Sequence, residues 1–140
     1  MKVDIWSDIM CTFCYIGKRK LEGALKNFDH ADEVEIVWHS FQLDPTMTAQ
    51  PGKDVYTYLA ERKGQSRDWS VQMHRQVVNM AADAGLEYNF DHAVIANSLD
   101  AHRLIQLAKT HGLGDVAEER LFRAYFTKAK TLPTTTPCSR

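Results

Sequence analysis

The fold of this chain is decided by the stretch from Val3 to Ile16, which reads VDIWSDIMCTFCYI. Val3 to Trp6 has the pattern of a short β-strand, and a helix is predicted to begin near Cys11 and to extend to Phe28. The Cys-x-x-Cys motif of Cys11 and Cys14 therefore lies at a helix start. Unpaired backbone N–H groups and the positive end of the helix dipole favour a thiolate there. Because the thiolate is the nucleophilic form, the placement predicts a redox-active pair.

The composition narrows the class of protein. The chain has 140 residues, of which 44% are hydrophobic, and its net charge is −1, so neither a nucleic acid nor another polyanion is expected as a partner. It has no apolar run of about 18 residues, and its first residues do not resemble a signal peptide. We therefore expect a cytoplasmic protein that does not span a membrane. In that compartment a Cys-x-x-Cys is catalytic or metal-binding more often than structural.

The segment after the first helix completes a strand–helix–strand unit. Residues 34–43 read as a second strand, and apolar side chains fall on both of its faces. This pattern is typical of a buried parallel strand that is covered on both sides. A unit of this length is a right-handed βαβ crossover with parallel strands.

From residue 45 the pattern becomes helical after a proline-containing loop. Four helices are expected: Val55 to Lys63, Ser66 or Asp68 to Gly85, Asn97 or Ser98 to Gly112, and Asp115 to Tyr125. Asp54 is expected to cap the first, and Gly64 to end it. Asp115 and Glu118 fit a capping box for the last. The chain thus divides into a βαβ unit (1–44), a helical domain (45–130) and an irregular tail (131–140).

Several side chains have ordinary structural interpretations. Trp69, Met73 and Met80 form a helical stripe that predicts core packing. The basic run from Lys18 to Lys20 is expected to be solvated. His39 lies on an apolar strand face, which favours a core histidine over a catalytic one.

A zinc site and a pair of inert thiols are the alternatives for the two cysteines. Zinc needs four ligands, but the chain has one other cysteine, Cys138, and its six histidines show no paired Cys/His spacing. We therefore expect no bound metal and favour redox chemistry.

Four segments resemble the DsbA-like thioredoxin-fold oxidoreductases, and the FrnE-type branch is the most similar. These segments are Trp6 to Arg19, Val37 to Pro45, Ala96 to Ser98 with His102-Arg103, and Leu121 to Phe126. The resemblance covers about residues 2–130. It implies an α/β fold, in which a partial thioredoxin-like βαβ unit is followed by an inserted all-helical lobe.

The resemblance also assigns roles to individual residues. Cys11 matches the exposed attacking cysteine and Cys14 the buried resolving cysteine. Asp4 matches a strand acid that helps to move the proton of the resolving thiol. The family usually has proline where this chain has Thr12, and the residues between the cysteines tune the redox potential.

Aromatic side chains near the motif are candidates for binding substrate. Trp6 and Phe13 are placed to rim a peptide-binding groove beside the cysteines. Core packing is the alternative interpretation, although Phe13, inside the motif, is expected to be exposed.

Relatives continue past the helical lobe into a cis-proline loop, two more strands and a last helix. This chain lacks those patterns, so we expect a C-terminally truncated or altered member. Two parallel strands are not stable alone, and the first strand would keep an unpaired edge. We therefore expect a homo-oligomer in which another chain completes the sheet.

The leading functional hypothesis is a thiol–disulfide oxidoreductase that acts on a protein or small-molecule disulfide or dithiol. It needs no bound cofactor, and glutathione or another thiol system would recycle the pair. One alternative is a glutathione-dependent isomerase or transferase, as in the hydroxychromene-carboxylate isomerases and kappa-class glutathione transferases. Another is an inactive remnant that serves only as an assembly module.

Overall fold

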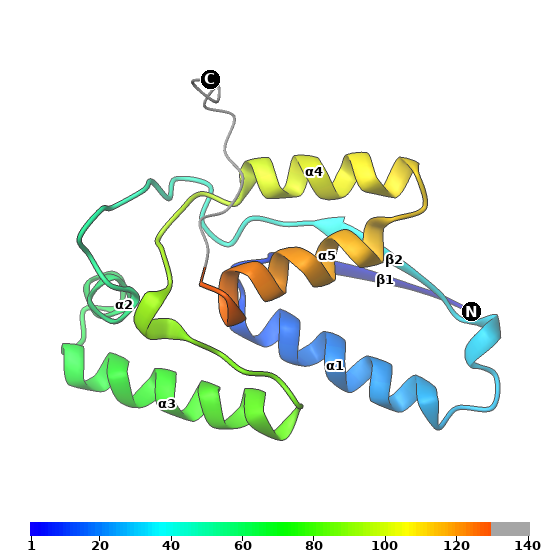
Figure 1. The fold of residues 1–140 in the computed structure, drawn as a ribbon, viewed down its shortest axis with the longest axis horizontal. Helices are drawn as coiled ribbons and strands as arrows, with labels where there is room; N and C mark the ends of the chain where they lie inside the picture. Colours follow the sequence, from blue (N-terminus) through cyan, green and yellow to red (C-terminus); the bar gives the residue numbers. More distant parts are fainter. Residues whose placement is uncertain (130–140) are drawn as a thin grey trace.

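The computed structural model describes residues 1–129 (Figure 1). Two strands and five α-helices follow in the order β1 (Lys2–Ser7), α1 (Thr12–Lys26), β2 (Glu35–Ser40), α2 (Val55–Lys63), α3 (Arg67–Asp83), α4 (Leu99–Thr110) and α5 (Gly114–Phe122). Short helical turns add η1 (Ala31–Glu33), η2 (Phe90–His92) and η3 (Arg123–Thr127). No helix in this part of the chain is both long and apolar enough to cross a membrane.

The strands β1 and β2 pair in parallel, with Ile5 opposite Trp38, and α1 connects them. This confirms the predicted βαβ unit. The second strand ends at Ser40, three residues earlier than expected. The backbone N–H of Leu43 donates to Oδ2 of Asp8 at 2.9 Å, so the chain has turned toward the loop after β1.

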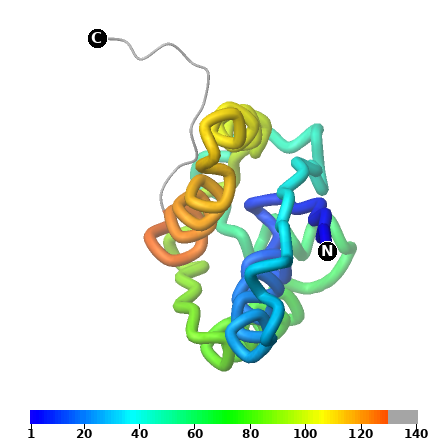
Figure 2. The backbone as a smooth tube through the Cα atoms, turned by 90° about the vertical axis from the view of Figure 1, so that its right-hand side faces the viewer, coloured from blue at the N-terminus to red at the C-terminus, as the bar shows by residue number. Residues whose placement is uncertain are grey.

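One face of this sheet is covered by helices. Trp38 is buried, and its indole N–H donates to Asp115 of α5 at 3.1 Å. On the other face Trp6 is 63% exposed and Phe41 53% exposed. In Figure 2, α4 and α5 lie on the side of the molecule opposite the N-terminus. The prediction that β2 is covered on both sides is therefore wrong for residues 1–129.

Helices α2 and α3 begin and end as their local sequence dictates. The Asp54 side chain accepts from the N–H of Thr57 at 2.7 Å, and Gly64 ends α2 with a left-handed φ of 62°. Ser66, rather than Asp68, caps α3 by accepting from the N–H of Trp69. These short-range contacts satisfy backbone groups at the helix ends.

The predicted capping box of α5 is wrong. The helix starts at Gly114, and neither Asp115 nor Glu118 bonds its first turn. Asp115 instead binds Trp38, and Glu118 is buried. Gly114 permits the tight turn after α4, since a Cβ there would lie 2.7 Å from Cγ of Lys109.

The core includes side chains from both sides of residue 44. Tyr15 of α1 stacks on Phe122 of α5 with ring centroids 4.8 Å apart, and Tyr88 stacks on Phe126 at 4.6 Å. Both pairs belong to one buried cluster. The division at residue 44 stays a prediction from the sequence. The predicted tail of residues 131–140, with Cys138, lies outside the described residues.

Candidate active site

The loop after β1 places the two cysteines at the start of α1. Cys11 is the N-cap residue, and its N–H donates to the carbonyl of Asp8 at 2.9 Å. The N–H of Cys14 donates to the carbonyl of Cys11 at 3.1 Å. The motif therefore occupies the helix start that the sequence predicts.

The two thiols form a hydrogen-bonded pair, and this contact has the largest effect on both. It lowers the pKa of the Cys14 thiol to about 6, while burial opposes the shift and the N–H of Asp8 and the Ser7 hydroxyl support it. The same contact raises the pKa of Cys11 far above its ordinary value. The pair thus releases its first proton easily and its second with difficulty, because two adjacent thiolates repel each other.

A cavity of about 420 Å³ opens beside Cys11. Its lining includes Cys11, Thr12 and Phe13 but not Cys14, and the remainder comes largely from apolar side chains of α2, α3 and the segments near Phe90 and Tyr125. Phe13 is 55% exposed, as expected. A substrate in this cavity would meet the sulfur of Cys11 first.

The side chains of α3 that were predicted to be core face this cavity instead. Trp69 and Met73 line it, and Met80 is exposed. The helical spacing correctly placed Trp69 and Met73 on one face of α3. The prediction of a closed core is wrong, because that face borders the cavity next to Cys11.

A buried hydrogen bond between two polar side chains anchors the loop before the cysteines. Nε2 of His102 on α4 lies 3.0 Å from Oδ1 of Asp8, and both side chains are buried. Asp8 also accepts from the N–H groups of Met10 and Leu43. Burial favours the neutral acid, but the bonds from His102, Leu43 and Met10 outweigh it and hold the pKa of Asp8 below its usual value.

The other predicted site residues lie on the open sheet face. Asp4 bonds Nε2 of His39 at 2.7 Å and pairs with Lys2 at 3.3 Å. Trp6 stacks on His39, which is one-third exposed rather than a core residue, and Trp6 does not line the cavity. The roles assigned to Asp4 and Trp6 stay predictions.

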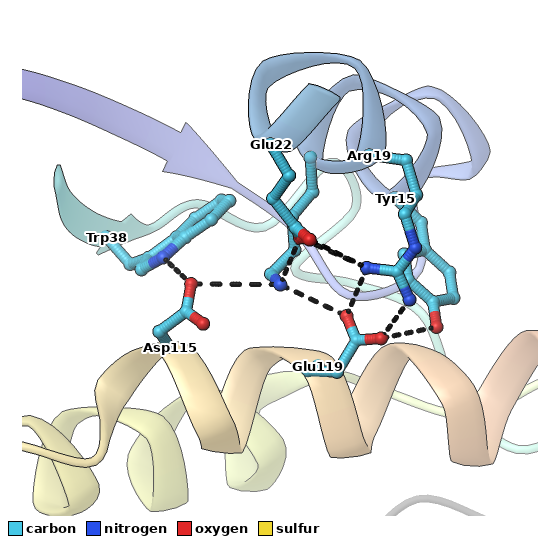
Figure 3. A network of polar contacts seen from close by, with 7 residues as sticks. Tyr15, Arg19, Glu22, Trp38, Asp115 and Glu119 are labelled. Atoms are coloured by element: carbon cyan, nitrogen blue, oxygen red, sulfur yellow. Dashed lines mark hydrogen bonds and ion pairs between the residues drawn. The ribbon is translucent and has the colours of Figure 1, made fainter. Parts of the chain in front are cut away.

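A polar network joins α1 to α5 (Figure 3). Lys18, expected to be solvated, is only 4% exposed, and its ammonium lies 2.7 Å from Glu22, 3.1 Å from Glu119 and 3.7 Å from Asp115. Arg19 also pairs with Glu119. The prediction for Lys18 is wrong because α5 lies over this part of α1.

Sequence reasoning missed Asp8, His102 and Glu118. Nothing in the sequence pairs Asp8 with His102, 94 positions away. Glu118 did carry a signal, because it shares a helical i, i+3, i+4, i+7 spacing with the apolar residues Leu121, Phe122 and Tyr125. A carboxylate on an apolar stripe marks a buried charge.

No group of three or more His, Cys, Asp or Glu side chains within residues 1–129 is arranged to hold a metal ion. The polar groups that interact with the cysteines include the Ser7 hydroxyl, the Asp8 backbone, the Tyr88 hydroxyl and the carboxylate of Glu118. These groups can shift the pKa values of the two thiols and exchange protons with them.

Comparisons with known proteins agree with this arrangement. The family described as a DSBA-like thioredoxin domain matches residues 2–136. The uncharacterized protein YwbO of Bacillus subtilis is 30% identical over 125 residues, which cover 89% of this chain and 56% of YwbO. The crystal structure of a probable DsbA oxidoreductase from Streptomyces coelicolor is 35% identical, with a TM-score of 0.86, and the match covers 94% of this chain and 56% of that one.

The chain thus spans a little over half the length of both relatives. The family match and the similar structure confirm the thioredoxin-like α/β fold expected from the sequence.

Proposed function

Because the chain belongs to the DsbA-like thioredoxin domain family, we propose that it catalyses thiol–disulfide exchange through Cys11 and Cys14. The observation that carries the proposal is the asymmetry of the pair. The thiols share a hydrogen bond, and only Cys11 lines the cavity. A pair in which only one sulfur faces the cavity suits an attacking and a resolving cysteine.

In the first step Cys11 attacks the substrate disulfide as a thiolate. Transfer of the shared proton to Cys14 makes Cys11 the charged sulfur, and the N–H groups of Phe13 and Cys14 favour that charge. The Cys11 sulfur bonds to one substrate sulfur, and the other leaves as a thiolate. The product is a mixed disulfide at Cys11.

In the second step Cys14 loses its proton and attacks the sulfur of Cys11. The Cys11–Cys14 disulfide forms, and the remaining part of the substrate leaves as a thiolate, so the substrate has gained two electrons and the enzyme has lost them. The reverse sequence oxidises a dithiol. No bound cofactor takes part in either direction.

The finer parts of the proposal come from the sequence. We place the chain in the FrnE-type branch and in the cytoplasm, with glutathione or another thiol system as its redox partner. The substrates are protein or small-molecule disulfides and dithiols. The apolar lining beside Cys11 supports substrates that carry apolar groups next to the sulfur.

A glutathione redox titration tests the function. Each sample of the Cys138→Ser protein is alkylated and the state of Cys11 and Cys14 is read by mass spectrometry. A two-electron transition confined to this pair is the expected result. Cys14→Ser should accumulate a mixed disulfide with glutathione at Cys11, whereas Cys11→Ser should form none. Absence of any Cys11–Cys14 disulfide across the titration would contradict the proposal.

The cavity also favours a second candidate, a glutathione-dependent isomerase or transferase. Its volume of about 420 Å³ and apolar lining suit a small apolar substrate held beside Cys11. That chemistry does not need a second thiol. Turnover of such substrates that survives Cys14→Ser would therefore favour this candidate over disulfide exchange.

A further inference from the structure

We propose that Glu118 accepts the proton that Cys14 loses when Cys14 resolves the mixed disulfide. This inference rests on the proposed function and assigns a role to a residue of the helical segment. In the balanced step, Cys14–SH and the Glu118 carboxylate become a thiolate and a carboxylic acid. The thiolate then bonds to the sulfur of Cys11, and the substrate sulfur departs as a thiolate.

The placement of Glu118 is the first observation. Its side chain is 0% exposed, and neither carboxyl oxygen has a hydrogen-bond partner among the described residues. A buried carboxylate without partners is unstable, so the group favours the form that carries a proton. Its free oxygens are also available to accept one.

The packing of α5 on α1 is the second observation. Asp115 of α5 contacts Lys18, and Phe122 stacks on Tyr15. Glu118 lies three residues after Asp115 and four before Phe122, so it shares the helix face that packs on α1. On α1, Cys14 precedes Lys18 by four residues and shares the facing stripe.

Charge coupling between the two groups is the third observation. Burial raises the pKa of Glu118 to about 8, and the negative charge of Cys14 contributes the next largest effect. Lys18 lowers that pKa, whereas Asp115 and Asp8 raise it. Because an ionised Glu118 and an ionised Cys14 disfavour each other, one proton is shared between them near neutral pH.

This arrangement matches the needs of the resolving step. An acceptor is most effective when its affinity for protons is close to that of the donor, and it can act in direct contact or through one water molecule. Glu118 reaches this condition because it is buried and its charge interacts with that of Cys14. Asp4, to which the family resemblance assigned the role, is bound instead to His39 and Lys2.

The first test measures the proton itself. The carboxylic-acid infrared band of the reduced protein is followed against pH, in wild type, Glu118→Gln, Glu87→Gln and Cys14→Ser. We expect a band that titrates near pH 8, disappears in Glu118→Gln and persists in Glu87→Gln, which changes an exposed carboxylate. Cys14→Ser should lower its midpoint, because the neighbouring negative charge is gone. A midpoint that Cys14→Ser leaves unchanged would overturn the inference.

The second test measures resolution. After reaction with glutathione disulfide, decay of the mixed disulfide is followed by quenched alkylation. Glu118→Gln should slow decay at least tenfold near pH 8, where Glu118 exchanges its proton, and the rate in this variant should rise in proportion to hydroxide. Glu87→Gln, a matched change at an exposed position away from this network, should behave as wild type. Equal decay rates in wild type and Glu118→Gln would overturn the inference.

The two proposals fail in different ways. Formation of the mixed disulfide, measured in the Cys14→Ser background, should not change with Glu118→Gln because Cys11 acts alone in that step. If no mixed disulfide forms in any variant, the proposed function is wrong. If it forms and resolves without Glu118, only the role of Glu118 is wrong. The infrared titration of Cys14→Ser does not require Glu118→Gln to fold.

Discussion

Cys11 and Cys14 belong to one helical turn, yet their surroundings differ. Cys11 borders the cavity and the free N–H groups of the helix start, whereas Cys14 bonds with Ser7 and the Asp8 backbone and interacts with the charge of Glu118. Both side chains are partly exposed, so Cys14 is less buried than the sequence led us to expect. The two cysteines therefore differ in the groups that surround them, not in how deeply they are buried.

The shared proton should be visible in the reactivity of the pair. The first ionisation has a pKa of about 6, so the rate of alkylation of the reduced protein should rise through that pH, well below the range of an isolated thiol. Iodoacetamide labelling against pH measures the midpoint. Cys14→Ala should move it upward, since Cys11 then has no thiol with which to share a proton. A wild-type midpoint near 9 would contradict the prediction.

Glu118 should also make stability depend on pH. Its pKa is raised in the folded state to about 8 from an ordinary value of 4.5, so its contribution to stability is complete below pH 4.5 and is lost as the pH rises toward 8. The shift sets an upper limit of about 5 kcal/mol. Urea unfolding of the reduced protein across this range should show a smaller decline in Glu118→Gln. An equal decline in both proteins would contradict the assignment.

At the scale of elements, the contact between α1 and α5 holds the active-site helix in place. Lys18 and Arg19 of α1 meet Glu119 of α5, and Tyr15 donates to the same carboxylate at 3.2 Å. Burial favours the neutral acid, but the bonds from Arg19 and Lys18 outweigh it and keep the pKa of Glu119 low. The network thus fixes α5, and with it Glu118, against the helix that carries the cysteines.

Loss of the buried ammonium should weaken this contact. Lys18→Met should lower the free energy of unfolding by about 1 kcal/mol, because the partly exposed carboxylates of Glu22, Glu119 and Asp115 lose their shared ammonium partner. Lys20→Met is a matched control, since Lys20 is exposed on the same helix and should change stability by less than about 0.5 kcal/mol. Urea denaturation compares the two variants. Equal effects would show that the network contributes no stability of its own.

At the scale of the whole molecule, residues 1–129 contain a sheet of two strands with one open face. Trp6 and Phe41 expose large apolar side chains there. Exposed apolar patches of this kind mark contact surfaces, and we propose that a second copy of the chain covers this one. The outer edge of β1 pairs with nothing among the described residues and supports the same proposal.

Light scattering after size exclusion should therefore detect a species larger than the monomer, and its fraction should rise with protein concentration. Phe41→Ser should reduce that fraction because it removes apolar area from the open face. Leu107→Ser, at a similarly exposed position on α4, should leave it unchanged. A monomer at every concentration would contradict the proposal.

The features that the sequence alone determined are local. Cys11 at a helix start, Asp54 and Ser66 as caps, and Gly64 as a helix end each depend on backbone groups a few residues away. The βαβ unit follows from the same short-range patterns, since strand, helix and strand are consecutive. Residue type and spacing are sufficient for such features, because the interacting groups lie within one or two turns.

Tertiary structure alone decided which distant side chains meet. Lys18 is buried, and Asp8 binds His102. Glu118 is also buried, whereas a helix-capping residue would be exposed to solvent. Trp69 and Met73 of the α3 stripe became part of a cavity wall because no element within residues 1–129 closes over them. Burial and pKa depend on everything that packs around a group, and here the partners lie about a hundred residues apart along the chain. No local pattern carries that information.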